Sequence, residues 1–146
     1  MSGVYLIVWD DDNQELLHTT KGGYPHITIA YTGKLLEKAK LVEIANKAMR
    51  EMVMNTVTLS NVFVNSFEDK HGNMRHDVSL QVKSDGMVEE FRQRELDVLE
   101  NSSKFYMRDL HVTHSIHTDR ASAEKVAKRV SKLLPYNVTI TGTTID

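Results

Sequence analysis

The feature that most constrains the fold is a pair of strand-like segments separated by a short, turn-rich loop. Residues 56–67 (TVTLSNVFVNSF) and 76–82 (HDVSLQV) are rich in β-branched and aromatic side chains, and the loop between them, EDKHGNMR, contains Gly72-Asn73. Strands joined by so short a loop pair antiparallel, because parallel strands need a much longer crossover connection. The chain is therefore expected to contain an antiparallel sheet.

The rest of the chain alternates between strand patterns and helix patterns. Strand patterns cover residues 4–9, 25–31, 106–117 and 136–144, and helical periodicity covers residues 34–54, 86–100 and 120–134. Asp119 is placed to cap the last helix and Pro135 to end it. The apolar stripe predicted to face inward on the first helix is Leu35, Ala39, Val42, Ala45, Met49 and Met52. Several strands, three helices and a hairpin predict an α+β fold.

Length and composition set the remaining bounds. The 146 residues predict a single domain over residues 1–146, and the absence of cysteine excludes disulfides and thiolate metal sites. A reducing compartment, the cytoplasm, fits a chain without cysteine. A formal net charge of −2 disfavours binding to long duplex nucleic acid, and no apolar stretch reaches membrane-spanning length. We therefore expect no membrane partner and a ligand that is small.

Two of the predicted strands carry the same short polar pattern. The stretch YPHITIAYTG contains His26 and Thr28, and LHVTHSIH contains His111 and Thr113. Because side chains alternate along a strand, His26 and Thr28 share one face while Ile27 and Ile29 share the other. Strict alternation likewise predicts His111, Thr113, Ser115 and His117 on one face of the second strand. A His-x-Thr match alone is weak evidence, since His18-Thr19-Thr20 matches too.

Imidazole and hydroxyl groups in this arrangement suit chemistry at phosphorus. One histidine can accept a proton while the other donates one, and the threonine hydroxyls can hold the non-bridging oxygens. This scheme needs no metal and no cofactor. A zinc site in HVTHSIH is disfavoured, because alternation points His114 away from His111. The alternative is that both segments are ordinary strands with polar solvent faces.

The paired HITI and HVTH motifs resemble the two signature motifs of the two-histidine (2H) phosphoesterase superfamily, the LigT-like phosphodiesterases. The resemblance implies a bilobal α+β fold, with antiparallel sheets lining a central cleft and helices outside. It also implies metal-independent phosphodiester cleavage, with His26 and His111 as the acid–base pair and Thr28 and Thr113 as phosphate ligands. His114 stands where the family has an apolar residue, and is expected to be packed and hydrogen-bonded.

The resemblance also implies a class of substrate. Family members act on 2′,3′-cyclic phosphates at RNA ends, on 2′-5′ oligoadenylates and on cyclic dinucleotides, and some are viral proteins that degrade immune signals. We expect a cyclic nucleotide or short oligonucleotide signal as substrate, in the host cytoplasm if the chain is viral. An RNA-end 2′,3′-cyclic phosphodiesterase and a non-catalytic module that sequesters a nucleotide remain the alternatives.

Further candidate ligands lie near the two motifs. Ser115 follows Thr113 and is a candidate additional phosphate ligand. Tyr24, Tyr106, Trp9 and Tyr5 are candidates for stacking on a nucleobase, because every base has a π-face on which an aromatic ring can stack. Core packing is the alternative role for Tyr5 and Trp9, and both roles remain open for Tyr24 and Tyr106.

Overall fold

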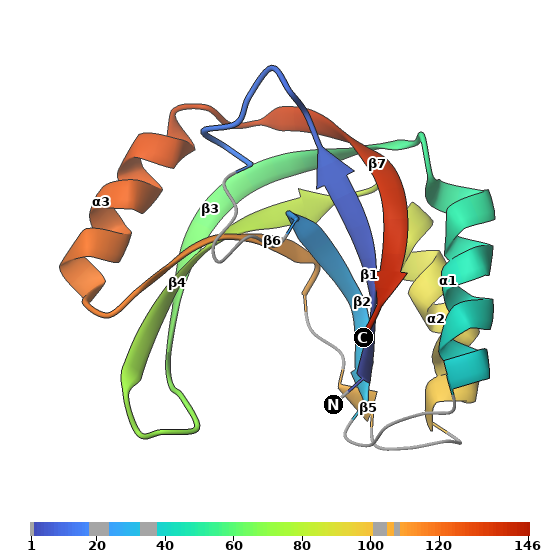
Figure 1. Cartoon of the computed structure of the whole chain (residues 1–146). Helices are drawn as coiled ribbons and strands as arrows, with labels where there is room; N and C mark the ends of the chain where they lie inside the picture. The colour runs from blue at the N-terminus through green and yellow to red at the C-terminus, as the bar shows by residue number, and fades with distance from the viewer. Residues whose placement is uncertain (1, 18–23, 33–37, 101–104, 107–108) are drawn as a thin grey trace.

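The computed structural model describes residues 2–17, 24–32, 38–100, 105–106 and 109–146, and these form one antiparallel sheet with three helices (Figure 1). The α+β prediction is therefore confirmed. The elements are β1 (Ser2–Trp9), β2 (His26–Thr32), α1 (Lys38–Met52), β3 (Thr56–Glu68), β4 (Met74–Lys83), α2 (Met87–Glu100), β5 (Phe105–Tyr106), β6 (His111–His117), α3 (Arg120–Ser131) and β7 (Tyr136–Ile145). The segment predicted as one strand over 106–117 contains β6 and the end of β5.

The strands run in the order β1-β7-β3-β4-β6-β2-β5, and β1 also pairs with β2. Six strands thus pair in a closed circuit, and the two-residue β5 pairs with β2 outside that circuit. Figure 1 shows the sheet strongly bent, with helices outside the bend. There α3 packs against β3, β4 and β6, α1 against β1 and β7, and α2 against β2.

The two faces of the sheet differ in chemistry. Val4, Leu6 and Val8 of β1 are at most 1% exposed and belong to the core beneath the helices. Register pairs Leu6 with Ile27 of β2, and Ile27 with Val112 of β6, so the buried aliphatic positions continue from strand to strand. Burying each such side chain contributes about 1.5–3 kcal/mol. The alternate residues are left on the opposite face, which is called the inner face below; α1, α2 and α3, the helices of the described residues, all lie on the other side (Figure 1).

The buried stripe predicted for α1 was wrong in part, because at two places the buried residue is the one that precedes the predicted residue. Leu41, Ile44 and Ala48 are buried, whereas the predicted Val42 and Met49 are 39% and 47% exposed. The predicted Ala45 and Met52 are buried, Ala39 is exposed, and Leu35 lies outside the described residues. Apolar residues cover more than one stripe of this helix, and docking onto β1 and β7 selects the stripe that becomes buried.

The cap predicted for α3 is confirmed. The Asp119 carboxylate accepts hydrogen bonds from the Ser122 backbone N–H at 2.8 Å and from the Ser122 hydroxyl at 2.6 Å. These bonds, together with the nearby His117 and His76, hold the pKa of Asp119 below its ordinary value. The cap orients α3 directly after β6, the strand that carries the second His-x-Thr motif.

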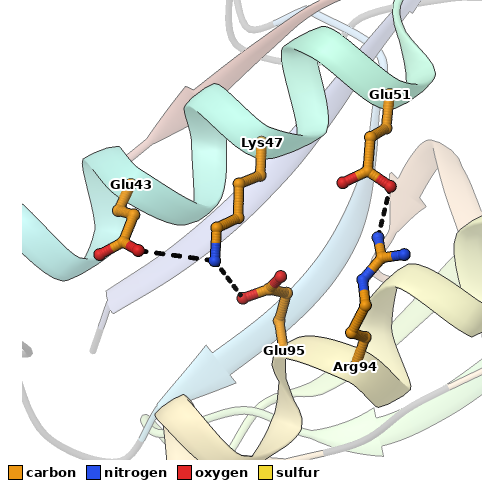
Figure 2. A network of polar contacts seen from close by, with 5 residues as sticks. All are labelled: Glu43, Lys47, Glu51, Arg94 and Glu95. Carbon is orange, nitrogen blue, oxygen red and sulfur yellow. Dashed lines mark hydrogen bonds and ion pairs between the residues drawn. The ribbon is translucent and has the colours of Figure 1, made fainter.

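Helices α1 and α2 are joined by the charged network that Figure 2 shows. Lys47 lies 3.4 Å from the carboxylate of Glu95 and 3.5 Å from that of Glu43, while Arg94 pairs with Glu51. The Glu95 side chain is 6% exposed, whereas Arg94 and Glu51 are 54% and 44% exposed. Lys47 is thus the cation that compensates a nearly buried carboxylate.

Replacing Lys47 with alanine is expected to lower the free energy of unfolding by about 2 kcal/mol, because it leaves the Glu95 carboxylate buried without its cation. The matched control Arg94→Ala breaks an exposed pair and is expected to cost at most about 1 kcal/mol. Urea denaturation of both variants measures the difference. Equal destabilisation by the two substitutions would contradict this assignment.

No helix in the described part of the chain is both long and apolar enough to span a membrane.

Candidate functional site

The two His-x-Thr motifs lie side by side on neighbouring strands. β2 and β6 run antiparallel, and their register pair is Ile27 with Val112, the buried middle residues of the two motifs. The residues that flank a register pair also face each other, so His26 lies opposite Thr113 and Thr28 lies opposite His111. Alternation places these four side chains on the inner face, away from the aliphatic core.

The pairing places the four side chains at the corners of a rectangle, whose longer sides of about 6.6 Å run along the strands. Directly opposite residues have Cβ atoms about 4.5–5.5 Å apart, and diagonal neighbours are separated by about 7–8 Å. His26 and His111 stand at one pair of diagonal corners, and Thr28 and Thr113 at the other. His26 is exposed, whereas the other three are half-buried. A tetrahedral group above the centre of the rectangle is therefore within reach of two imidazoles and two hydroxyls.

Both motif histidines are oriented in the same way. The Nδ1 atom of His26 lies 3.0 Å from the Tyr24 carbonyl oxygen, and that of His111 lies 2.8 Å from the Asp109 carbonyl oxygen. A carbonyl oxygen only accepts, so Nδ1 carries the proton and donates in both rings. When the rings are neutral, each therefore presents an unprotonated Nε2, the atom that a general base uses.

An aromatic ring contacts each motif histidine edge-on. Tyr5 of β1 lies 5.1 Å from His26 between ring centroids, and Phe63 of β3 lies 6.2 Å from His111. The Tyr5 hydroxyl donates to the Asp146 carboxylate at 2.7 Å, which holds this ring in place. Tyr5 was a stacking candidate from the sequence, whereas Phe63 was not among the predicted residues. The alternation Tyr5-Ile7-Trp9 in β1 was the available signal for Tyr5, and Phe63 could be found only from the pairing of strands.

Strand β4 contributes polar neighbours on the other side of β6. Ser79 pairs in register with Thr113, and Gln81 pairs with His111, so both lie on the inner face. Ser79 is 2% exposed and Gln81 is half-buried. The site floor therefore continues from β2 through β6 to β4.

The prediction that Ser115 and His117 share a face with Thr113 was wrong. A bulge interrupts the β4–β6 register, so that Ser79 pairs with Thr113 but the next residue, Val78, pairs with Ser115. The extra residue of a bulge reverses the alternation beyond it, which puts Ser115 and His117 on the helix side of the sheet. Ser115 is 7% exposed, and its hydroxyl lies 2.8 Å from Nε2 of His117. Its predicted role as a phosphate ligand beside Thr113 therefore has no support in this arrangement.

His114 is packed and hydrogen-bonded, as expected. It is 3% exposed, and its Nε2 atom donates to the Glu15 carbonyl oxygen at 2.9 Å. That bond leaves Nδ1 as the acceptor for the Ser115 hydroxyl at 3.0 Å. Both ring nitrogens of His114 are thus hydrogen-bonded on the helix side of the sheet, away from the four motif side chains.

The other three aromatic residues predicted to stack on a base have different positions. Tyr24 is 68% exposed, and its backbone carbonyl orients His26. Trp9 is half-buried and pairs in register with Thr139, and its indole N–H donates to Asp11. Tyr106 pairs with Tyr31 through the backbone, and its side chain lies outside the described residues.

Among the described residues, no group of three or more histidine, aspartate or glutamate side chains is arranged to hold a metal ion. No protein-family model and no curated protein sequence matches this chain.

Proposed function

We propose that this protein is a metal-independent phosphodiesterase of the 2H type, with a bilobal arrangement around the inner face. The observation that carries the proposal is the register pair between Ile27 and Val112, which brings two His-x-Thr motifs together across neighbouring strands. The sequence positions of the motifs differ by 85 residues (111 − 26), so their adjacency is a property of the fold.

The diagonal placement of the histidines supports in-line displacement at phosphorus. The neutral imidazole takes a proton on Nε2 from the nucleophile, either water or a ribose 2′-hydroxyl, as that oxygen bonds to phosphorus. The protonated imidazole gives its Nε2 proton to the departing oxygen as the second P–O bond breaks. The hydroxyls of Thr28 and Thr113 donate hydrogen bonds to the non-bridging oxygens, where negative charge increases in the transition state. After one turnover the two histidines have exchanged protonation states, and exchange with solvent resets them.

The substrate proposed for this site is a cyclic nucleotide or a short oligonucleotide signal of the kind used in immune defence. The formal net charge of −2 supports a small ligand, since tracking a long polyanion needs a basic field. Phe63, which is 38% exposed beside His111, supplies apolar surface for a base that flanks the phosphate.

A substrate panel tests the proposal. We expect turnover of at least one of the cyclic dinucleotides, cyclic trinucleotides, 2′-5′ oligoadenylates or 2′,3′-cyclic nucleotides, at a rate unchanged by EDTA. Product formation is followed by ion-exchange chromatography, with tight binding measured in parallel. Loss of all activity in EDTA, restored by added metal, would contradict the mechanism. Binding without any product would instead identify a sequestering module.

A further inference from the structure

A pocket separate from the four motif side chains lies next to His111. It has a volume of about 500 Å³ and lies where β4 and β6 approach α2. Its lining residues are Gln81, Val82, Lys83, Glu89, Arg92, Asp109 and Leu110. The volume lies within the range of pockets that bind small organic ligands. None of these residues belongs to the His-x-Thr motifs, and the pocket is linked to the proposed proton transfers only by the Asp109 backbone carbonyl, which orients His111.

The charges around this pocket are balanced. Lys83 and Arg92 are cationic and Glu89 and Asp109 are anionic. Arg92 is 7% exposed, and one of its terminal nitrogens donates to the Thr28 carbonyl oxygen at 3.0 Å, so its guanidinium is held against the backbone of the first motif. Burial lowers the pKa of Arg92, and attraction by Glu89 and Asp109 opposes that shift. A lining with two charges of each sign disfavours a second phosphate and also a free cation, and it favours a neutral ligand that both donates and accepts hydrogen bonds.

The pocket is connected to the motif site through two of its residues. Gln81 is the register partner of His111, and the Asp109 carbonyl oxygen accepts the Nδ1 proton of His111. Adjacent paired strands lie about 4.8 Å apart. The pocket therefore adjoins His111, one of the four side chains proposed to surround the phosphate.

We propose that this pocket holds a nucleobase with an exocyclic amine, an inference that rests on the proposed phosphodiesterase function. The carboxylates of Asp109 and Glu89 accept hydrogen bonds from the amine, and the Lys83 ammonium donates to the ring nitrogen beside it. Adenine, guanine and cytosine each have an amine next to an accepting ring nitrogen. Hypoxanthine and uracil lack the amine, so a carboxylate placed for it faces a carbonyl oxygen or a C–H group instead. The pocket thus selects amino-bearing bases within the proposed substrate class.

The test compares nucleotides that differ at the amine. Binding of AMP, GMP and IMP, and of CMP and UMP, is measured by isothermal titration calorimetry. We expect AMP or GMP to bind at least about 10-fold more tightly than IMP, the discrimination typical of one well-placed bidentate contact. The comparison of AMP with GMP identifies the preferred purine. In Asp109→Asn and Glu89→Gln the preference over IMP is expected to fall to about 3-fold or less.

Glu90→Gln is the matched control, because Glu90 is an exposed neighbour on α2 that does not line the pocket. Asp109→Asn retains the backbone carbonyl that orients His111, and circular dichroism verifies that each variant is folded. Equal affinities for AMP, GMP and IMP, a preference that survives both pocket substitutions, or no nucleotide binding would overturn the pocket assignment. His26-dependent turnover with no base preference overturns only the pocket, whereas base preference without turnover of any substrate overturns only the phosphodiesterase.

Discussion

Replacing either His26 or His111 with alanine is expected to lower kcat about 1,000-fold on any substrate that the wild-type protein turns over. Each variant loses one of the two proton transfers, and general acid–base catalysis by a positioned side chain contributes about 10²–10⁴-fold. The double variant is expected to be nearly as active as either single variant, because the two rings act as one unit at the same phosphorus. Steady-state kinetics with saturating substrate measures all three.

The dependence of rate on pH separates the two roles. The wild-type protein is expected to show a bell-shaped profile, since one imidazole must be neutral and the other protonated. Each single variant then loses one limb of the bell, and the limb lost identifies the base or the acid. His71→Ala is the matched control, because His71 is an exposed histidine in the turn between β3 and β4. A His26→Ala variant that retained the activity of His71→Ala would exclude His26 from the chemistry.

Replacing Thr28 or Thr113 with valine is expected to lower kcat about 100-fold while KM changes little. Valine keeps the shape and removes the hydroxyl, and loss of one donor to a developing oxyanion typically lowers kcat about 10²–10³-fold. An effect on kcat rather than on KM indicates that the hydrogen bond strengthens in the transition state. Both positions flank the pair Ile27–Val112 on the inner face, so similar losses are expected from both.

Two comparisons control this experiment. Thr139→Val removes a hydroxyl from β7, outside the two motif strands, and is expected to leave kcat unchanged. Thr28→Ser and Thr113→Ser restore the hydroxyl and are expected to recover most of the activity. If serine failed to restore activity where valine had abolished it, the threonine methyl group and its packing would be responsible, and phosphate binding by the hydroxyl would be ruled out.

Much of the local structure could be predicted from residue order. The β-rich apolar run VYLIVW and the alternation in ITIAY identified strands, and helical periodicity with an aspartate cap identified α3. The strands and the cap depend on neighbours within a few residues, where side-chain alternation and capping geometry are set by the backbone itself. The packed role of His114 was instead predicted from the motif resemblance, because His114 stands where the 2H motif has an apolar residue.

The misplacement of Ser115 shows the limit of that reasoning. Alternation assumes an unbroken strand, and the extra residue at the β4–β6 bulge depends on how the two strands pair. The buried stripe of α1 depends in the same way on the strands beneath the helix. Phe63 reaches His111 from β3, at a position that its own sequence context does not indicate, and the contact of Tyr5 with His26 depends on the pairing of β1 with β2.

The amino-acid order alone therefore determined the type of each element and the two His-x-Thr patterns, since these arise from contacts between near neighbours in the chain. Only the tertiary structure decided that the patterns face each other across β2 and β6, that Ser115 turns away, and that a charge-balanced pocket adjoins His111. The physical reason is that strand register is selected by the burial of aliphatic side chains across the whole sheet. A shift of one residue in that register would move every polar group to the opposite face.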